Sequence, residues 1–126
     1  HQAPNSKEEL SIYFNKKWYL IKVKSEKIFG DFKSHLNSQI VSDLILKDIF
    51  KINHSDSYKN IEYIKGNQPL SFLVNRVNLL GDSIGIQLYP HVIEEITSMA
   101  DMGENMPPKS TWIEPKLRSG LTIYEY

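Results

Sequence analysis

Cysteine is missing from the 126 residues of this chain. Without thiols the chain forms no disulfide and has neither a thiolate nucleophile nor a cysteine-ligated zinc site. Long apolar runs are missing as well, since no run approaches the roughly 20 residues that a membrane helix needs. The sequence shows no signal-peptide pattern. From these absences we expect a cytoplasmic protein.

An excess of charge of either sign is also missing. Lys and Arg number 15, and Asp and Glu number 15. A chain with no net charge has no general attraction to nucleic acid or to an anionic membrane surface. We therefore expect neither as a partner, and any anion-binding site has to be local.

Histidine is sparse, and its spacing does not suggest a metal site. The four histidines are His1, His35, His54 and His91. None of them has the His-x-x-x-His or His-x-His spacing that is common among zinc ligands. We expect no metal in this chain.

The first nine residues, HQAPNSKEE, carry neither a strand nor a helix pattern. We interpret residues 1–9 as a linker from a preceding part of a longer protein; a processed mature terminus is the alternative. Residues 10–126 have the length of a single ordinary domain. On this interpretation, part of any active site belongs to polypeptide outside this sequence.

Apolar periodicity predicts an alternation of strands and helices. Residues 10–14 and 17–23 are rich in β-formers, and Asn15-Lys16 between them suits a tight hairpin turn. The second run is apolar on both faces, which is typical of an inner strand. The predicted elements are strands at 10–14 and 17–23, a helix at 35–50, a strand at 61–65, a helix at 68–81, a strand at 83–89, a helix at 91–103 and a strand at 120–126.

Turn and capping residues delimit the later helices. Pro69 suits a first helical turn, and Gly81 and Gly103 are typical helix stops. Glu94 and Glu95 follow a helix start, where surface carboxylates compensate the helix dipole. The element order is β-β-α-β-α-β-α-loop-β. It predicts an α+β domain with a mixed sheet of about five strands covered by three helices.

The segment GENMPPKST, from Gly103 to Thr111, comes close to a nucleotide-binding loop. That pattern is Gly, four residues, Gly, Lys and then Ser or Thr; here Pro108 replaces the second glycine. A nucleotide loop leads from a strand into a helix and offers backbone N–H groups to phosphate. This segment follows a helix, its prolines lack N–H groups, and Pro115 prevents a long helix from following. The nucleotide-loop interpretation is therefore rejected.

Cations and hydroxyls are nevertheless concentrated in KSTWIEPKLRSG. A local anion-binding site is one interpretation, because Lys and Arg neutralise an anion while hydroxyls donate to it. Asp101 and Glu104, at the preceding helix end, would lie near such a site. A proline-stiffened surface segment is the other interpretation. The candidate anion-binding residues are Lys109, Ser110, Thr111, Lys116, Arg118 and Ser119.

The stretch MADMGENMPPKSTWIEPKLRSGL closely resembles the C-terminal signature of the bacterial and archaeal family known as domain of unknown function 1015. In that signature Met-Pro-x-Lys-Ser-Thr and an aromatic residue are followed by Pro-Lys-Leu and Ser-Gly-Leu. The matching positions are Met106, Pro107, Lys109, Ser110, Thr111, Trp112, Pro115, Lys116, Leu117, Ser119, Gly120 and Leu121. IYFNKKWYLIKV and the stretch from LILKDIFKI to IEYIKG resemble upstream segments of the family, so the resemblance covers nearly the whole chain after about residue 10.

The resemblance is to the C-terminal part of longer proteins. Their preceding part carries an Asp-Gly-His-His-Arg motif similar to that of the ParB and sulfiredoxin-like superfamily, which includes nucleotide-dependent kinases of free serine. That motif is absent here. The resemblance implies a site shared with a missing N-terminal domain and a link to serine or phosphoserine metabolism. It also implies a nucleotide cofactor for the longer protein and none for this part.

These observations lead us to expect that Lys109, Ser110 and Thr111 line a site for a small anionic metabolite. The longer protein would then be a small-metabolite kinase, phosphotransferase or phosphatase, and this part alone would be inactive. The alternative is a structural module that packs on the N-terminal domain or forms a homodimer, with no site of its own. Nucleic-acid binding has little support, since aromatic residues do not alternate with a basic stripe.

Overall fold

The computed structural model describes residues 2–52 and 57–111. Its first element is a β-hairpin of β1 (Glu9–Phe14) and β2 (Lys17–Lys22). Asn15 and Lys16 in the turn have φ angles of 48° and 60°. Two successive positive φ values match the twist of a two-residue hairpin, and the predicted hairpin is confirmed.

A third strand, β3 (Gly85–Leu88), pairs with the other edge of β1. The order is β2-β1-β3, and both pairings are antiparallel. In the described residues the sheet is therefore antiparallel rather than mixed, and β1 is the inner strand. The prediction that the second strand is an inner one is not confirmed, since β2 lies at the sheet edge in the part of the chain that the structure describes. Apolar residues on both faces of a strand do not decide which strands pair with it.

The strand predicted at residues 61–65 has no regular secondary structure. Glu62 in this segment forms an ion pair with Arg76, with 2.8 Å between Oε2 and Nε. A short β-prone run becomes a strand only where a sheet edge is available to pair with it, and this one lies against a helix instead. The strand predicted at 120–126 lies outside the described residues, so the α+β class is confirmed and the five-strand sheet is not.

The helix predicted at residues 35–50 is replaced by shorter pieces of different pitch. Partway along, the backbone hydrogen bonds span five residues instead of four: the N–H of Phe50 donates to the carbonyl of Ile45 at 3.0 Å. That spacing defines a π-helix. The pieces are the 3₁₀-helix η2 (Lys33–His35), the α-helix α1 (Asn37–Ile40) and the π-helix η3 (Val41–Lys47).

The remaining helices follow their predicted positions more closely. α3 (Leu70–Leu80) begins after Pro69 and ends at Gly81, whose φ is 78°. α4 (Ile93–Asp101) is followed by Gly103 with a φ of 69°. Both glycines have a positive φ, which glycine adopts without the steric cost of a side chain. Two short elements complete the described fold: the 3₁₀-helix η1 (Ser25–Lys27) and the α-helix α2 (Ser57–Asn60).

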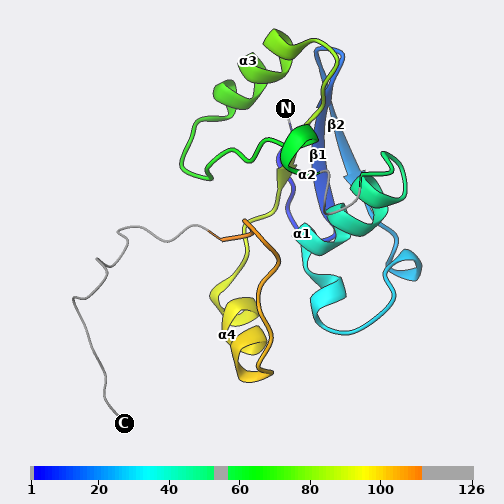
Figure 1. Ribbon diagram of the computed structural model, residues 1–126, viewed down its shortest axis with the longest axis vertical. Coiled ribbons are helices and arrows are strands. Elements are labelled where there is room, and N and C mark those ends of the chain that lie inside the picture. The colour runs from blue at the N-terminus through cyan, green and yellow to red at the C-terminus, as the bar shows by residue number, and fades with distance from the viewer. Residues whose placement is uncertain (1, 53–56, 112–126) are drawn as a thin grey trace, which may run out of the picture.

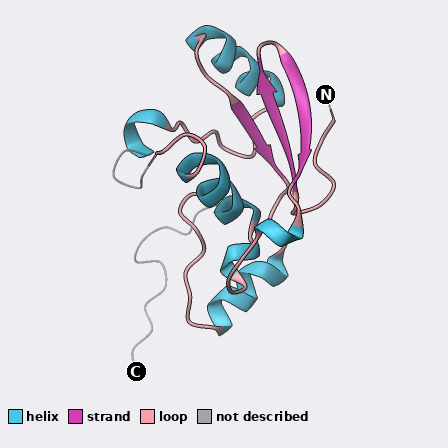
Figure 2. Cartoon of the chain, turned by 90° about the vertical axis from the view of Figure 1, so that its right-hand side faces the viewer, coloured by secondary structure: helices cyan, strands magenta, loops and turns pink. Residues whose placement is uncertain are grey.

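The hydrophobic core lies between one face of the sheet and the α1–η3 helices. Leu10 of β1 is fully buried against Val41 and Ile45. The partly buried apolar residues around it come from β1, β3, η3 and the position after β2: Ile12, Ile86, Leu88, Leu46 and Val23. Figure 1 shows α3 and α4 at opposite ends of the molecule, with the sheet and α1 between them. Figure 2 shows the three strands side by side.

The N-terminal residues contact the sheet. The hydroxyl of Ser11 donates to the carbonyl of Gln2, and the N–H of Val23 donates to the carbonyl of Glu8 at 2.8 Å. Pro4 is buried. The interpretation of residues 1–9 as a linker stays a prediction, and these contacts fix the segment to β1 and to the end of β2.

Candidate functional site

The predicted anion-binding segment begins with a tight turn from Pro107 to Ser110. The N–H of Ser110 donates to the carbonyl of Pro107 at 3.3 Å. Pro108 occupies the second position of the turn, and Lys109 occupies the third with a φ of 60°. This is a type II arrangement, in which the third position normally requires glycine. Holding a lysine there costs on the order of 1–2 kcal/mol.

The side chains of the turn differ in what they offer an anion. Lys109 and Thr111 are exposed. The hydroxyl of Ser110 donates to the carbonyl of Pro107 at 2.6 Å. Because its one proton is used inside the turn, Ser110 can accept a hydrogen bond but cannot donate to an anion in this conformation. Lys116, Arg118 and Ser119 lie outside the described residues.

The loop that carries the turn is anchored to the helices. Pro107 is buried, and the N–H of Glu104 donates to the carbonyl of Met99 at 2.9 Å. The carboxylate of Glu104 pairs with Lys33 of η2 at 3.4 Å. Glu104 therefore joins the loop to η2 instead of neutralising Lys109. Figure 1 shows the loop running back along α4 toward the sheet.

An apolar groove of about 500 Å³ lies between the sheet and η3. Several of its side chains are substantially exposed, among them Phe14 at 53%, Tyr19 at 46% and Phe50 at 46%. Volumes of about 300–1,000 Å³ are typical of ligand cavities. The lining residues are Leu10, Ile12, Phe14, Tyr19, Ile21, Val23, Leu44, Ile45, Ile49, Phe50 and Ile84.

A smaller hollow of about 150 Å³ lies beside η1 and η3, between Lys27 and Asp43. Lys109 lines neither this hollow nor the apolar groove. The turn at 107–110 therefore presents its cation on an open surface of the described part of the chain.

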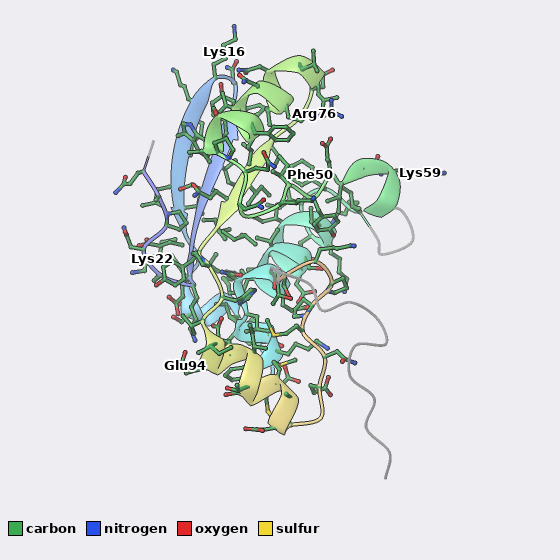
Figure 3. The ribbon with its side chains drawn as sticks, turned by 90° about the vertical axis from the view of Figure 1, so that its left-hand side faces the viewer. Lys16, Lys22, Phe50, Lys59, Arg76 and Glu94 are labelled. Carbon is green, nitrogen blue, oxygen red and sulfur yellow. The ribbon has the colours of Figure 1, made fainter. Side chains whose placement is uncertain are left out.

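A third arrangement joins residues that the sequence keeps far apart. Nδ1 of His91 lies 2.7 Å from Oε2 of Glu95, and Nε2 of His91 lies 3.2 Å from Oγ of Ser38. The side chains of His91 and Glu95 are only 6% and 13% exposed. The interpretation of Glu95 as a surface charge is therefore wrong, whereas Glu94 is exposed on the outer side of α4, as Figure 3 shows.

Sequence reasoning missed this cluster. The spacing of His91 and Glu95 was a usable signal, because residues four apart share a face in the helix predicted at 91–103; in the structure His91 lies two residues before α4. Ser38 lies 53 positions from His91, and no local pattern relates them. They meet because β3 leads the chain past α1 before α4 begins.

Within residues 2–52 and 57–111, no three metal-ligating side chains are grouped so as to hold a metal ion. No helix in the same residues combines the length and the apolar composition needed to cross a membrane.

Comparisons of this chain with protein-family models, curated proteins and solved structures found no match. The resemblance to the family of domain of unknown function 1015 thus stays a prediction, carried by the sequence segments named above.

Proposed function

We propose that this chain contributes an anion-binding turn to a small-metabolite site, and that the ligand carries a phosphate or carboxylate group. The observation that carries the proposal is the backbone of Lys109. A positive φ at a non-glycine residue stores strain, and such strain is concentrated at functional sites. Lys109 has this conformation, is exposed, and is followed by a second exposed donor, the hydroxyl of Thr111.

The chemistry of the turn suits a single anionic group. A lysine ammonium acts as a compact point charge with three donors. The buried Pro107 and the bond between Ser110 and Pro107 hold the backbone beside it in one conformation. The ligand then loses little binding energy to ordering the turn. The family resemblance makes serine or phosphoserine the first metabolites to test, with the remaining contacts supplied by residues outside the described part.

The test is binding of inorganic phosphate and of O-phosphoserine, measured by calorimetry at constant ionic strength with chloride as the competing salt. Lys109→Gln should weaken binding by about tenfold or more, because a hydrogen bond to a charged group contributes about 1.5–3 kcal/mol. Lys51→Gln is the matched control, since Lys51 is also an exposed lysine with a positive φ of 56°. Equal weakening by both substitutions, or binding that chloride abolishes, would refute the proposal.

A second candidate function is a module that associates with another copy of this chain. The half-exposed rings of Phe14, Tyr19 and Phe50 around the groove favour it, since contiguous apolar surface marks interfaces. The balanced charge of 15 basic and 15 acidic residues leaves no net repulsion between copies. Sedimentation velocity over a wide concentration range distinguishes the two functions: a monomer at every concentration excludes this one and leaves the anion-binding turn unaffected.

A further inference from the structure

The side chains of Ser38, His91 and Glu95 form a continuous chain of hydrogen bonds. The imidazole of His91 stands between the other two, with one ring nitrogen toward each. The distance of 2.7 Å to Glu95 is that of a short hydrogen bond, and the 3.2 Å to Ser38 lies at the long end of the hydrogen-bond range. Both members of the His91–Glu95 pair are almost withdrawn from solvent.

The partners of His91 assign the roles of its two nitrogens. An ionised carboxylate only accepts hydrogen bonds, so in the neutral tautomer that fits both partners Nδ1 of His91 carries the proton and its N–H donates a hydrogen bond to Glu95. Nε2 is then left with its lone pair and accepts from the hydroxyl of Ser38. A neutral imidazole aimed in this way at a serine hydroxyl, with a carboxylate behind it, is the arrangement that activates a serine for nucleophilic attack.

The surrounding fold keeps these groups in place. Asn37, next to Ser38, is buried and donates through its side-chain amide to the carbonyl of Tyr89, two residues before His91. This contact fixes the start of α1 against the segment that carries His91. Glu95 is held in the first turn of α4. Ser38 itself is half-buried.

A second observation points to a ligand at this place. Oδ1 of Asn37 is buried and has no hydrogen-bond partner among the described residues. A buried acceptor without a partner is costly, on the order of 1–3 kcal/mol. A water molecule or a donor group of a substrate beside Ser38 would satisfy it.

We propose that Ser38 is the nucleophile of an acyl-transfer centre that hydrolyses small carboxylic esters, with His91 as general base and Glu95 as the positioning residue. Oγ of Ser38 attacks the ester carbonyl carbon while its proton passes to Nε2 of His91. The bond from that carbon to the alkoxy oxygen breaks, and the alcohol leaves with the proton. Water, deprotonated by His91, then attacks the acyl carbon; the bond from that carbon to Oγ of Ser38 breaks, His91 returns the proton to Oγ, and the carboxylic acid leaves.

The direct test is covalent labelling by a fluorophosphonate probe, which forms a phosphorus–oxygen bond to an activated serine and releases fluoride. Peptide mapping by mass spectrometry should place the label on Ser38. Ser42→Ala is the matched control, because Ser42 is a half-buried serine of the adjoining η3, and this variant should be labelled at the wild-type rate. A wild-type protein labelled no faster at Ser38 than at Ser42 would overturn the proposal.

The dependence of Ser38 reactivity on His91 distinguishes a catalytic role of the cluster from a purely structural one. His91→Gln should slow labelling of Ser38 and hydrolysis of p-nitrophenyl acetate by about 100-fold, the contribution typical of a general base. Glu95→Gln should lower kcat, leave KM unchanged and alter the pH profile of kcat. Circular dichroism checks that the variants are folded. Folded His91→Gln protein that is labelled at the wild-type rate would show that the cluster only joins α1 to α4.

Discussion

The two faces of the three-stranded sheet are covered differently. One face carries Tyr13 and Gly85 and lies under α3, where Tyr13 is 5% exposed. The other face carries Leu10 and Phe14, and the α1–η3 helices cover only its Leu10 end. Leu10 is 0% exposed and Phe14 is 53% exposed, although both belong to β1 and project from the same face.

This difference shows that strand alternation selects the face of a residue without deciding its burial. Leu10 and Phe14 are both apolar and project from the same face, yet Leu10 packs in the buried cluster with Val41 and Ile45, whereas Phe14 lines the open groove. Burial is decided by where the helices lie on the sheet. The apolar groove lies where this face and η3 do not close on each other, and Leu44 and Ile45 of η3 form part of its wall.

The largest expected effect tests the uneven cover of the apolar face. Leu10→Ala should lower the free energy of unfolding by about 2–5 kcal/mol, since it leaves a cavity in the core. Phe14→Ala on the same strand and face should lower it by about 1 kcal/mol or less. Urea denaturation followed by fluorescence measures both. Equal losses would mean that the Phe14 end is covered in solution.

The opposite face is tested at Gly85. A Cβ added there would lie 2.2 Å from Cδ2 of Leu73 and 3.1 Å from Cγ2 of Val77 in α3. Gly85→Ala should therefore destabilise the protein by about 1–3 kcal/mol through overpacking.

Leu73→Ala in the Gly85→Ala background supplies the control, because it removes the atom that is in conflict. The double variant should lose less stability than the sum of the two single losses, as a double-mutant cycle measures. Additive losses would mean that α3 does not pack this closely on β3.

The smallest expected effect concerns the polar contact under α3. The hydroxyl of Tyr13 donates to Oδ1 of Asn78 at 3.1 Å, and its ring lies 5.1 Å from that of Trp18. Tyr13→Phe keeps the ring contact and removes the hydrogen bond, so the loss should be about 0.5–1.5 kcal/mol. Thermal unfolding of Tyr13→Phe, compared with that of Asn78→Ala, measures this loss of stability. A loss as large as that of Leu10→Ala would contradict the assigned role of this contact.

Local signals in the sequence were sufficient for the hairpin and for the ends of two helices. Asn15 adopts the positive φ that asparagine tolerates, and Lys16 follows it through the turn, while Gly81 and Gly103 follow the ends of α3 and α4. Each of these signals acts within a few residues. The strand predicted at 61–65 failed because a strand requires a partner, and no local pattern shows whether one is present.

The candidate sites also differ in whether a local stretch of sequence reveals them. The concentration of cations and hydroxyls after Gly103 was visible in the sequence, and its function stays a prediction. That Ser110 uses its proton on Pro107, and that Glu104 pairs with Lys33, was not visible. The cluster of Ser38, His91 and Glu95 depends on a contact across 53 positions.

The sequence by itself determined the α+β class, the hairpin and the places where α3 and α4 end, because turn and capping preferences are properties of a few neighbouring residues. Only the tertiary structure decided the antiparallel strand order, the uncovered part of the apolar face and the meeting of Ser38 with His91. Those features arise from packing between distant segments. Their stability depends on contacts with residues that a short stretch of sequence does not identify.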